Sequence, residues 1–187
     1  LPGHTVKVVP MSDDELAAGV VAHTVDFVLT NPTHYVLLRE SNLLSGALAT
    51  MVSRQGDQAL HGIGGVIIRR AERADLRTLS HLRGKRIAIA GRHFLGTYMA
   101  PAVELMKAGV DLNTLSWVET TQPVDQVITS VLTGVADAGF VRTGVLEDLA
   151  REGKLNPAEL AIINPQKQPG FMFTTSTRLY PEWPFLA

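Results

Sequence analysis

The chain has 187 residues, of which 45% are hydrophobic and 19% are charged, and its 17 Lys and Arg residues nearly balance its 18 Asp and Glu residues. This composition disfavours a disordered segment and a basic nucleic-acid-binding domain, and the lack of cysteine excludes disulfide bonds and thiolate metal ligands. Because no uncharged apolar run approaches the roughly 20 residues that cross a bilayer, we expect a soluble globular unit.

Apolar runs of strand length alternate with segments of helical period, which predicts parallel βαβ units whose helices cover the sheet. In the first part of the chain, the expected strands are residues 5–9, 25–29, 45–53 and 63–68. Ser12 and Glu15 have the spacing of a capping box, which predicts the start of a short helix. Asn31 and Pro32 suit the cap and the first position of the next helix, expected at 33–40.

The second part of the chain repeats this alternation. The expected strands are residues 86–90, 115–119, 137–141, 161–163 and 171–174. A helix over 97–108 ends at Gly109, another begins at Pro123 and stops at Gly134, and a third, over 147–152, closes at Gly153.

Two segments divide these elements into two groups. The charged residues 69–75 separate the first group from the second, and the Pro-containing link 164–170 leads back toward the first. Two crossings indicate a hinge between two lobes, with residues 1–66 and 166–187 in lobe 1 and residues 67–165 in lobe 2. We expect each lobe to hold a mostly parallel sheet flanked by helices, with a ligand cleft between the lobes.

Three corners combine the carboxyl end of a predicted strand with a helix start, where free backbone N–H groups favour anions. The candidate ligand-binding residues are Asn31, Thr33, His34 and Tyr35 at the first corner, Arg92, His93, Thr97 and Tyr98 at the second, and Arg142 at the third. The Arg142 guanidinium can hold a carboxylate, phosphonate or sulfur oxyanion through two hydrogen bonds. Each corner also has a structural alternative, in which Asn31 and Thr33 only cap a helix and Arg142 stays in solvent.

Other chemistries find less support in the sequence. Gly91 and Gly96 have the spacing of a phosphate-binding loop, but Thr97 and Tyr98 stand where that loop needs Lys and Ser or Thr, which disfavours NTP hydrolysis. The six histidines show no zinc-binding spacing, and no nucleophile elbow is present. We therefore expect no catalytic residues, no metal and no cofactor in this chain.

Residues 25–36 resemble a known family signature. They include Asp26-Phe27, Thr30-Asn31-Pro32 and His34-Tyr35-Val36, and this run is similar to the DF-x-x-TNP-x-HYV signature of phosphonate-binding-protein-like periplasmic domains. Further stretches resemble the subgroup that forms input domains of bacterial sensor histidine kinases: residues 64–67, 82–85, 136–144 and 176–185. The resemblance implies a type 2 periplasmic-binding-protein fold, with two α/β lobes that close on a small ligand.

The resemblance also implies a function. The chain would be the extracytoplasmic, periplasmic ligand-sensing domain of a membrane-anchored sensor histidine kinase, and it would bind a small anion between its lobes and possess no catalysis of its own. The implied contacts are Asn31, Thr33, His34 and Tyr35 in one lobe and Thr97, Tyr98 and Arg142 in the other. The loop that contains Arg92 and His93 differs from the Ser/Thr-rich loop of phosphonate binders.

Several alternatives stay open at this point. The chain could be a free solute-binding protein that feeds an ABC transporter, or a transferase or lyase on the same fold, and a homodimer is compatible with either binding role. It begins at Leu1 without an initiator Met and ends at Ala187, so we interpret it as a fold truncated at both chain ends.

Overall fold

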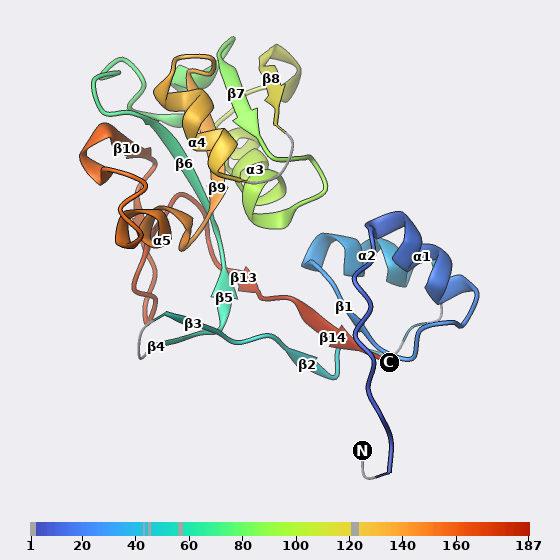
Figure 1. Cartoon of the computed structure of the whole chain (residues 1–187). Coiled ribbons are helices and arrows are strands. Elements are labelled where there is room, and N and C mark those ends of the chain that lie inside the picture. The colour runs from blue at the N-terminus through green and yellow to red at the C-terminus, as the bar shows by residue number, and fades with distance from the viewer. Residues whose placement is uncertain (1–2, 43, 45, 56–57, 121–123) are drawn as a thin grey trace.

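Two α/β lobes joined by a narrow crossing make up the chain in the computed structural model, which describes residues 3–42, 44, 46–55, 58–120 and 124–187 (Figure 1). We call the five-stranded sheet and its helices the large lobe, and the three-stranded sheet with its two helices the small lobe. The α-helices are α1 (Asp13–Val21), α2 (Pro32–Ser41), α3 (Ala100–Lys107), α4 (Asp125–Leu132) and α5 (Val145–Arg151). Short 3-10 helices are η1 (Leu79–Leu82), η3 (Leu112–Thr114) and η4 (Pro157–Glu159), and η2 (Leu95–Met99) is a π-helix.

The helix starts follow from their capping residues. In α1, Ser12 Oγ accepts from Glu15 N at 3.3 Å while Glu15 Oε2 accepts from Ser12 N at 2.8 Å, which confirms the predicted capping box. In α2, Asn31 Oδ1 accepts from His34 N at 3.0 Å, which confirms the predicted cap. The expected helix over 97–108 begins earlier, as η2, and continues as α3. The predicted helix start at Pro123 lies outside the described residues.

The large lobe contains one strand that runs against the other four. Its sheet has the order β10-β6-β9-β7-β8, in which β7 is parallel to β8 and β9, whereas β6 is antiparallel to β9 and β10. The strand bounds are β6 (Gly65–Arg70), β7 (Arg86–Ile89), β8 (Ser116–Glu119), β9 (Ala138–Arg142) and β10 (Leu160–Ile163). The mostly parallel sheet that we expected is therefore present here, interrupted by the strand that enters from the small lobe.

The small lobe has the same arrangement on a smaller scale. Its sheet has the order β1-β14-β2, and both pairs are antiparallel, because β14 returns from the large lobe between two strands of the opposite direction. The strand bounds are β1 (Val28–Leu29), β2 (Ala49–Thr50) and β14 (Pro184–Leu186). The mostly parallel pairing expected for this lobe is not seen. The strand predicted at 45–53 is reduced to β2 and the start of β3, and its first residue, Ser45, lies outside the described residues.

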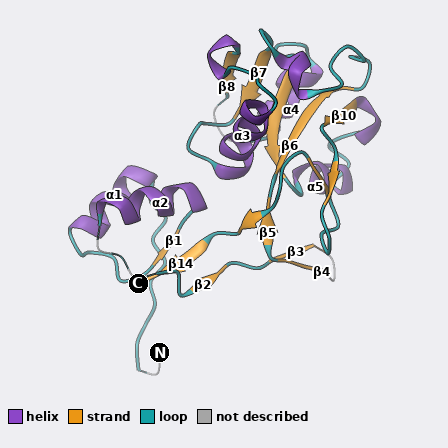
Figure 2. Cartoon of the chain, turned by 180° about the vertical axis from the view of Figure 1, so that it is seen from behind, coloured by secondary structure: helices purple, strands orange, loops and turns teal. Residues whose placement is uncertain are grey.

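The predicted strand at 5–9 is also absent. These residues are extended and exposed, with Val6 70% and Val8 85% accessible, and they form an arm that points away from both lobes (Figure 2). A strand requires a hydrogen-bonding partner, and none of the strands in the described ranges pairs with this segment.

Short strands build the crossing between the lobes. The strands β5 (Gly62–Ile63) and β13 (Tyr180–Pro181) pair there in antiparallel fashion. Beside them, Ser176 N donates to Gly65 O at 2.8 Å and Gly65 N donates to Thr177 Oγ1 at 3.0 Å. The remaining strands form hairpins: β3 (Ser53–Gln55) with β4 (Gln58–Leu60), and β11 (Gln166–Lys167) with β12 (Thr174–Thr175).

The charged stretch 69–75, which we expected to separate the two groups of elements, lies instead at the far end of β6. Arg73 ties it to the large lobe through a hydrogen bond to Asp137 at 3.0 Å, and it also donates to Asp75 within the stretch at 2.8 Å. The chain passes between the lobes at Gly62–Gly65 because β6 already pairs with β9 from Gly65 onward and with β10 from Ile67 onward.

Candidate functional site

The first corner lies at the start of α2, on the side of the small lobe that faces the large lobe. Asn31 and His34 are buried, with 4% and 7% of their surface accessible. Nδ1 of His34 lies 2.9 Å from Oγ1 of Thr30, which is buried beside it. The Asn31 cap and the Thr30 hydroxyl therefore fix the backbone and the ring of His34.

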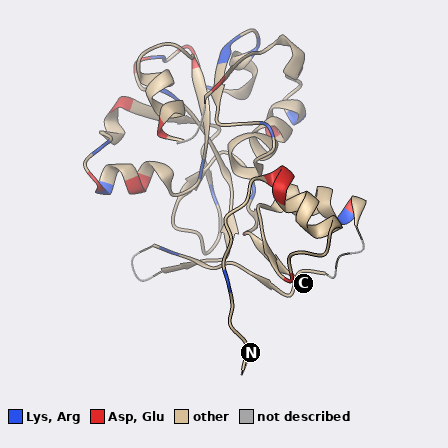
Figure 3. Cartoon of the chain, turned by 45° about the vertical axis from the view of Figure 1, so that its right-hand side comes forward, with Lys and Arg blue, Asp and Glu red and all other residues tan. Residues whose placement is uncertain are grey.

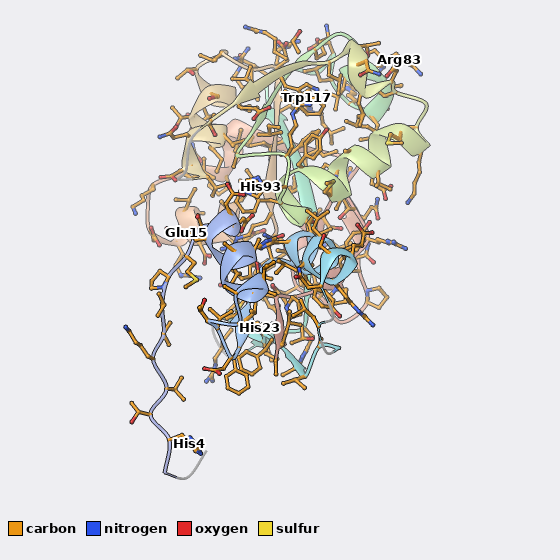
Figure 4. The ribbon with its side chains drawn as sticks, turned by 90° about the vertical axis from the view of Figure 1, so that its right-hand side faces the viewer. His4, Glu15, His23, Arg83, His93 and Trp117 are labelled. Atoms are coloured by element: carbon orange, nitrogen blue, oxygen red, sulfur yellow. The ribbon has the colours of Figure 1, made fainter. Side chains whose placement is uncertain are left out.

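A carboxylate from α1 joins this corner to the second one. Asp13 Oδ1 lies 3.3 Å from Nδ1 of His34, and Asp13 Oδ2 lies 3.8 Å from Nε2 of His93 in the loop after β7. Figure 4 shows His93 next to the start of α1, close to Glu15. The imidazoles come from different lobes, so one carboxylate spans the gap between the lobes at this point.

A groove of about 1090 Å³ opens at this contact. Its charged end holds the first turn of α1, where Figure 3 shows the acidic residues gathered, together with the two imidazoles. Its other walls are mostly apolar. The lining residues are Met11, Ser12, Asp13, Asp14, Ala17, Ala18, Val21, His34, Leu37, Leu38, Ser41, Asn42, His93 and Phe94.

The second corner also contacts the third. A Cβ placed on Gly96 would lie 3.0 Å from Cβ of Arg142 and 3.1 Å from the carbonyl oxygen of Gly64, so glycine permits this close packing. Thr97 is 7% accessible, and its hydroxyl has no hydrogen-bond partner among the described residues. The three predicted corners are therefore contiguous at the junction of the two lobes.

At the third corner, the Arg142 side chain lies beside a buried carboxyl. Arg142 Nη1 donates to the backbone oxygen of Thr143 at 3.3 Å. Glu182, 5% accessible, precedes β14 and accepts a 3.4 Å hydrogen bond from Ser53 Oγ. Burial raises the pKa of Glu182, although the positive charge of Arg142 and the Ser53 hydroxyl oppose the shift.

Three predicted site residues are engaged elsewhere. Arg92 Nε donates to Glu119 at 2.8 Å, and its guanidinium lies over the ring of Trp117 at 5.4 Å. Tyr98 packs edge-on against the same Trp117 ring at 5.2 Å. Tyr35 packs on the core of the small lobe, and its hydroxyl accepts from Arg39. These side chains are not among those that line the groove, and Thr33 is half-buried in the first turn of α2 without being one of them.

Sequence reasoning missed Asp13 and Glu182. An acidic residue after an N-cap has a sufficient local explanation in the helix dipole, so nothing in the sequence around Asp13 indicates that it faces two histidines. Glu182 follows a Tyr-Pro pair near the chain end, where no periodic pattern signals burial. Only the tertiary packing reveals these two carboxyl groups.

Two further features are absent from the part of the chain that the structure describes. There, no group of three or more His, Cys, Asp or Glu side chains is arranged to hold a metal ion. Likewise, no helix within the described ranges has the length and apolarity that crossing a membrane requires.

Two α/β lobes, joined by crossing strands and with a groove at their junction, define a type 2 periplasmic binding protein, and solved structures share this fold. XAC2383 from Xanthomonas citri bound to ATP matches with a TM-score of 0.71 at 16% identity, covering 93% of this chain and 61% of that one. PhnD1 from Prochlorococcus marinus in complex with methylphosphonate matches with a TM-score of 0.64 at 16% identity, covering 95% of this chain and 62% of that one.

The sequence places the chain more narrowly. A family model described as "ABC transporter, phosphonate, periplasmic substrate-binding protein" matches residues 2–187, and the chain belongs to this family. It is also 28% identical over 188 residues to the tetrathionate sensor histidine kinase TtrS of Salmonella typhimurium. That match includes 100% of this chain but only 31% of the length of the Salmonella protein.

Proposed function

We propose that the chain is the ligand-sensing domain of a sensor histidine kinase and that a small ionised solute binds between its lobes. The observation that carries the binding role is the meeting of His34 and His93, one from each lobe, at a single groove. Similarity to a sensor kinase along the whole chain favours sensing over other uses of the fold. Phosphotransfer would belong to another part of the parent protein.

Closure of the lobes would transmit the signal. We propose that the small and large lobes move as two bodies about the short β5–β13 crossing, with the boundary near Gly62–Gly65 and not after residue 66, because Gly65 and Val66 already pair with β9. A ligand shifts such an equilibrium only by its preference for the closed state, and a hundredfold preference supplies about 2.7 kcal/mol. The side chains that would sense closure are those already near both lobes, Asp13 and His93.

The setting of the domain follows from the same relatives. We propose a periplasmic location for this chain and a membrane anchor elsewhere in the parent, because a sensor must reach solutes outside the cytoplasm. A homodimer would fit signalling between two kinase subunits. Of the predicted site residues, His34 and His93 line the groove, Asn31, Thr33, Thr97 and Arg142 lie at the adjoining corners without lining it, and Tyr35, Arg92 and Tyr98 contact other side chains.

A binding screen tests the proposal. Phosphonates, sulfur oxyanions and small carboxylates are added to the purified chain, and its melting temperature is recorded. A ligand at a hundred times its Kd should stabilise the protein by about 2.7 kcal/mol, or roughly 5–10 °C for a chain of this size. His93→Ala should lose at least tenfold in affinity by calorimetry, whereas His4→Ala, on the exposed arm, should bind as the wild type does. A flat screen, or unchanged binding by His93→Ala, would contradict the proposed site.

The alternative function is that of a solute-binding protein of an ABC transporter, which the description of the matching family supports. The two functions differ in the protein that the closed domain would regulate, which is a kinase for a sensor and a transporter for a solute-binding protein. For a sensor, the identified ligand should change the autophosphorylation of the full parent protein in membrane vesicles, and His93→Ala should move that response to higher ligand concentration. Ligand-stimulated ATP hydrolysis by a transporter, with no kinase response, would support the alternative function in transport.

A further inference from the structure

The contact between Asp13 and His93 joins the lobes through a group whose charge depends on pH. Oδ2 of Asp13 lies 3.8 Å from Nε2 of His93, which is longer than a hydrogen bond. A neutral imidazole at this distance therefore gains little from the carboxylate, whereas a protonated imidazole is attracted to it as one charge to another. Imidazole is the side-chain group that ordinarily titrates between pH 5 and 8, so acidity controls this attraction between the lobes.

His34 holds the same carboxylate from within the small lobe. Its Nδ1 lies 2.9 Å from Oγ1 of Thr30 and 3.3 Å from Oδ1 of Asp13. Because an Nδ1 without a proton would direct its lone pair at the carboxylate, this geometry favours an Nδ1 that carries one. The buried His34 ring thus orients Asp13 through one oxygen, and the other oxygen is left for the imidazole of the large lobe.

The charged groups around His93 are mostly negative. The titratable and charged groups that lie near it are Asp13, Asp14 and Glu15 from α1, His34 from α2 and Arg92 from its own loop. Arg92 donates to Glu119 of β8, so its charge is already paired. The described residues that line the groove include no Lys or Arg. A proton on His93 therefore meets three carboxylates of the small lobe and no permanent cation of the groove.

We propose that the proton is a second closing signal for this domain and that His93 receives it. At acid pH the imidazolium pairs with the Asp13 carboxylate across the gap and draws the lobes together without a solute, and the attraction is lost as the pH rises. With 51% of the His93 side chain and 42% of that of Asp13 accessible, such a pair should change the ratio of closed to open chain about two- to fivefold. This inference goes beyond the proposed function, since it concerns the chain without a solute, but it depends on the same closure of the lobes.

The distance between the lobes tests the inference. The chain has no cysteine, so Val36→Cys on α2 and Met106→Cys on α3 place one spin label in each lobe. Both side chains are exposed, and the two helices face each other in Figures 1 and 2. Pulsed EPR without added solute should show the short-distance population growing about two- to fivefold between pH 8 and pH 5. In 1 M salt, where the Debye length is about 3 Å, most of this growth should disappear.

Variants in the labelled chain separate the charge of His93 from other effects of acid. His93→Gln does not titrate, so its distances should stay at the pH 8 distribution throughout, whereas His93→Arg should show the short distance already at pH 8. Asp13→Asn should also abolish the response. The controls are His4→Gln, on the exposed arm in Figure 4, and Asp26→Asn, an exposed carboxylate that does not line the groove, and both should respond as the parent does.

The remaining outcomes separate the inference from the proposed function. A pH response that persists in His93→Gln, or distances that do not change with pH at all, would overturn the inference and leave the binding role intact. If a solute from the binding screen shortens the distance but acid does not, the lobes close and the proton is not a signal. If acid acts as expected while no solute binds, the inference stands and the proposed function fails. Circular dichroism verifies that each variant is folded.

Discussion

Each lobe contains one strand that enters from the other lobe and runs antiparallel to its neighbours, but the lobes differ in how extensively they are packed. In the large lobe, β6 has six residues and β9 five, and its sheet is covered by apolar clusters on both faces. In the small lobe, β1 and β2 have two residues each, and a single cluster around Val28, Leu38 and Leu186 supports one face of the sheet. The opposite face leaves Phe27 43% and Leu29 51% accessible.

This difference assigns the lobes different parts in binding. The large lobe supplies a fixed wall, the His93 loop, whereas α1 and α2 supply most of the groove from the less supported lobe. Regions with few buried apolar contacts open at lower free energy than well-packed cores. We therefore expect a ligand to organise the small lobe more than the large one, which the following variants test.

Core truncation in each lobe gives the largest expected effect. Phe140 and Leu186 are both fully buried. Phe140→Ala should destabilise the protein by about 3–5 kcal/mol, because the ring packs at the centre of the large lobe against Trp117. Leu186→Ala should cost about 2 kcal/mol, at the lower end for a buried leucine, since the small core can collapse around it. Denaturant unfolding measures both.

Hydrogen exchange followed by mass spectrometry sharpens that comparison. In the wild type, peptides from α1 and α2 should exchange faster than those from β6 and β9, and a bound ligand should protect mainly the former. Equal destabilisation by Phe140→Ala and Leu186→Ala, together with equal exchange in both lobes, would show that the small lobe is not the weaker one.

A substitution at the junction of the lobes should cause the next largest loss of stability. A Cβ on Gly65 would lie 2.5 Å from Cγ of Pro101 and 2.8 Å from the oxygen of Gly96, so Gly65→Ala forces α3 and η2 away from β6. We expect a loss of about 3 kcal/mol, the upper end for overpacking, and weaker ligand binding through the displaced His93 loop. Gly64→Ala is the control, because its nearest contacts are 3.3 Å. Thermal unfolding of both variants tests this expectation, because Gly65→Ala should melt at a lower temperature than Gly64→Ala. Similar melting temperatures would contradict the expected clash.

The sequence predicted the large lobe better than the small one, and packing explains why. Strands such as β7 and β9 are buried on both faces, so each is a continuous apolar run that a sequence reveals. In the small lobe, whether a segment forms a strand depends on the presence of a partner strand. Residues 5–9 have the composition of a strand but no partner strand among the residues that the structure describes.

The residues of the candidate site also fall into those whose positions the sequence could predict and those whose positions it could not. The caps at Asn31 and Ser12 are local signals, which the sequence contains in full, so the position of His34 was predictable. Arg92 and Tyr98 do not line the groove, because their side chains contact Glu119 and Trp117, which lie on a strand more distant in the sequence. Side-chain direction at a loop depends on such distant partners, and a motif alone does not encode it.

A carboxylate of the large lobe that is paired with arginines should make a smaller, pH-dependent contribution to stability. Burial acts to raise the pKa of Asp137, but hydrogen bonds from Arg86 and Arg73 outweigh it and hold the pKa well below its ordinary value. Because the folded pKa is depressed, this stabilisation is complete above the unfolded pKa of about 3.8 and is lost as the pH falls toward the folded pKa.

Replacing the Asp137 carboxylate tests this account. Asp137→Asn should cost about 2 kcal/mol at pH 7 and progressively less below pH 4, as measured by urea unfolding across pH. Asp75→Asn is the control, because Asp75 pairs with the same Arg73 but is more than half exposed, and a much smaller loss is expected. A cost for Asp137→Asn that does not change with pH would show that the ion pairs are not its source.

The carboxyl at the crossing should behave in the opposite way, with the smallest effect. Because burial raises the pKa of Glu182 above its ordinary 4.5, ionisation penalises the folded state, and stability is lost as the pH rises through the folded pKa. Glu182→Gln keeps an acceptor for Ser53 and removes the charge, so it should stabilise the protein at pH 7 by up to about 1 kcal/mol and have no effect near pH 4. Glu40→Gln, at an exposed position, should change nothing at either pH. If Glu182→Gln destabilises at neutral pH, attraction to Arg142 outweighs burial, and the crossing is held by that charge pair.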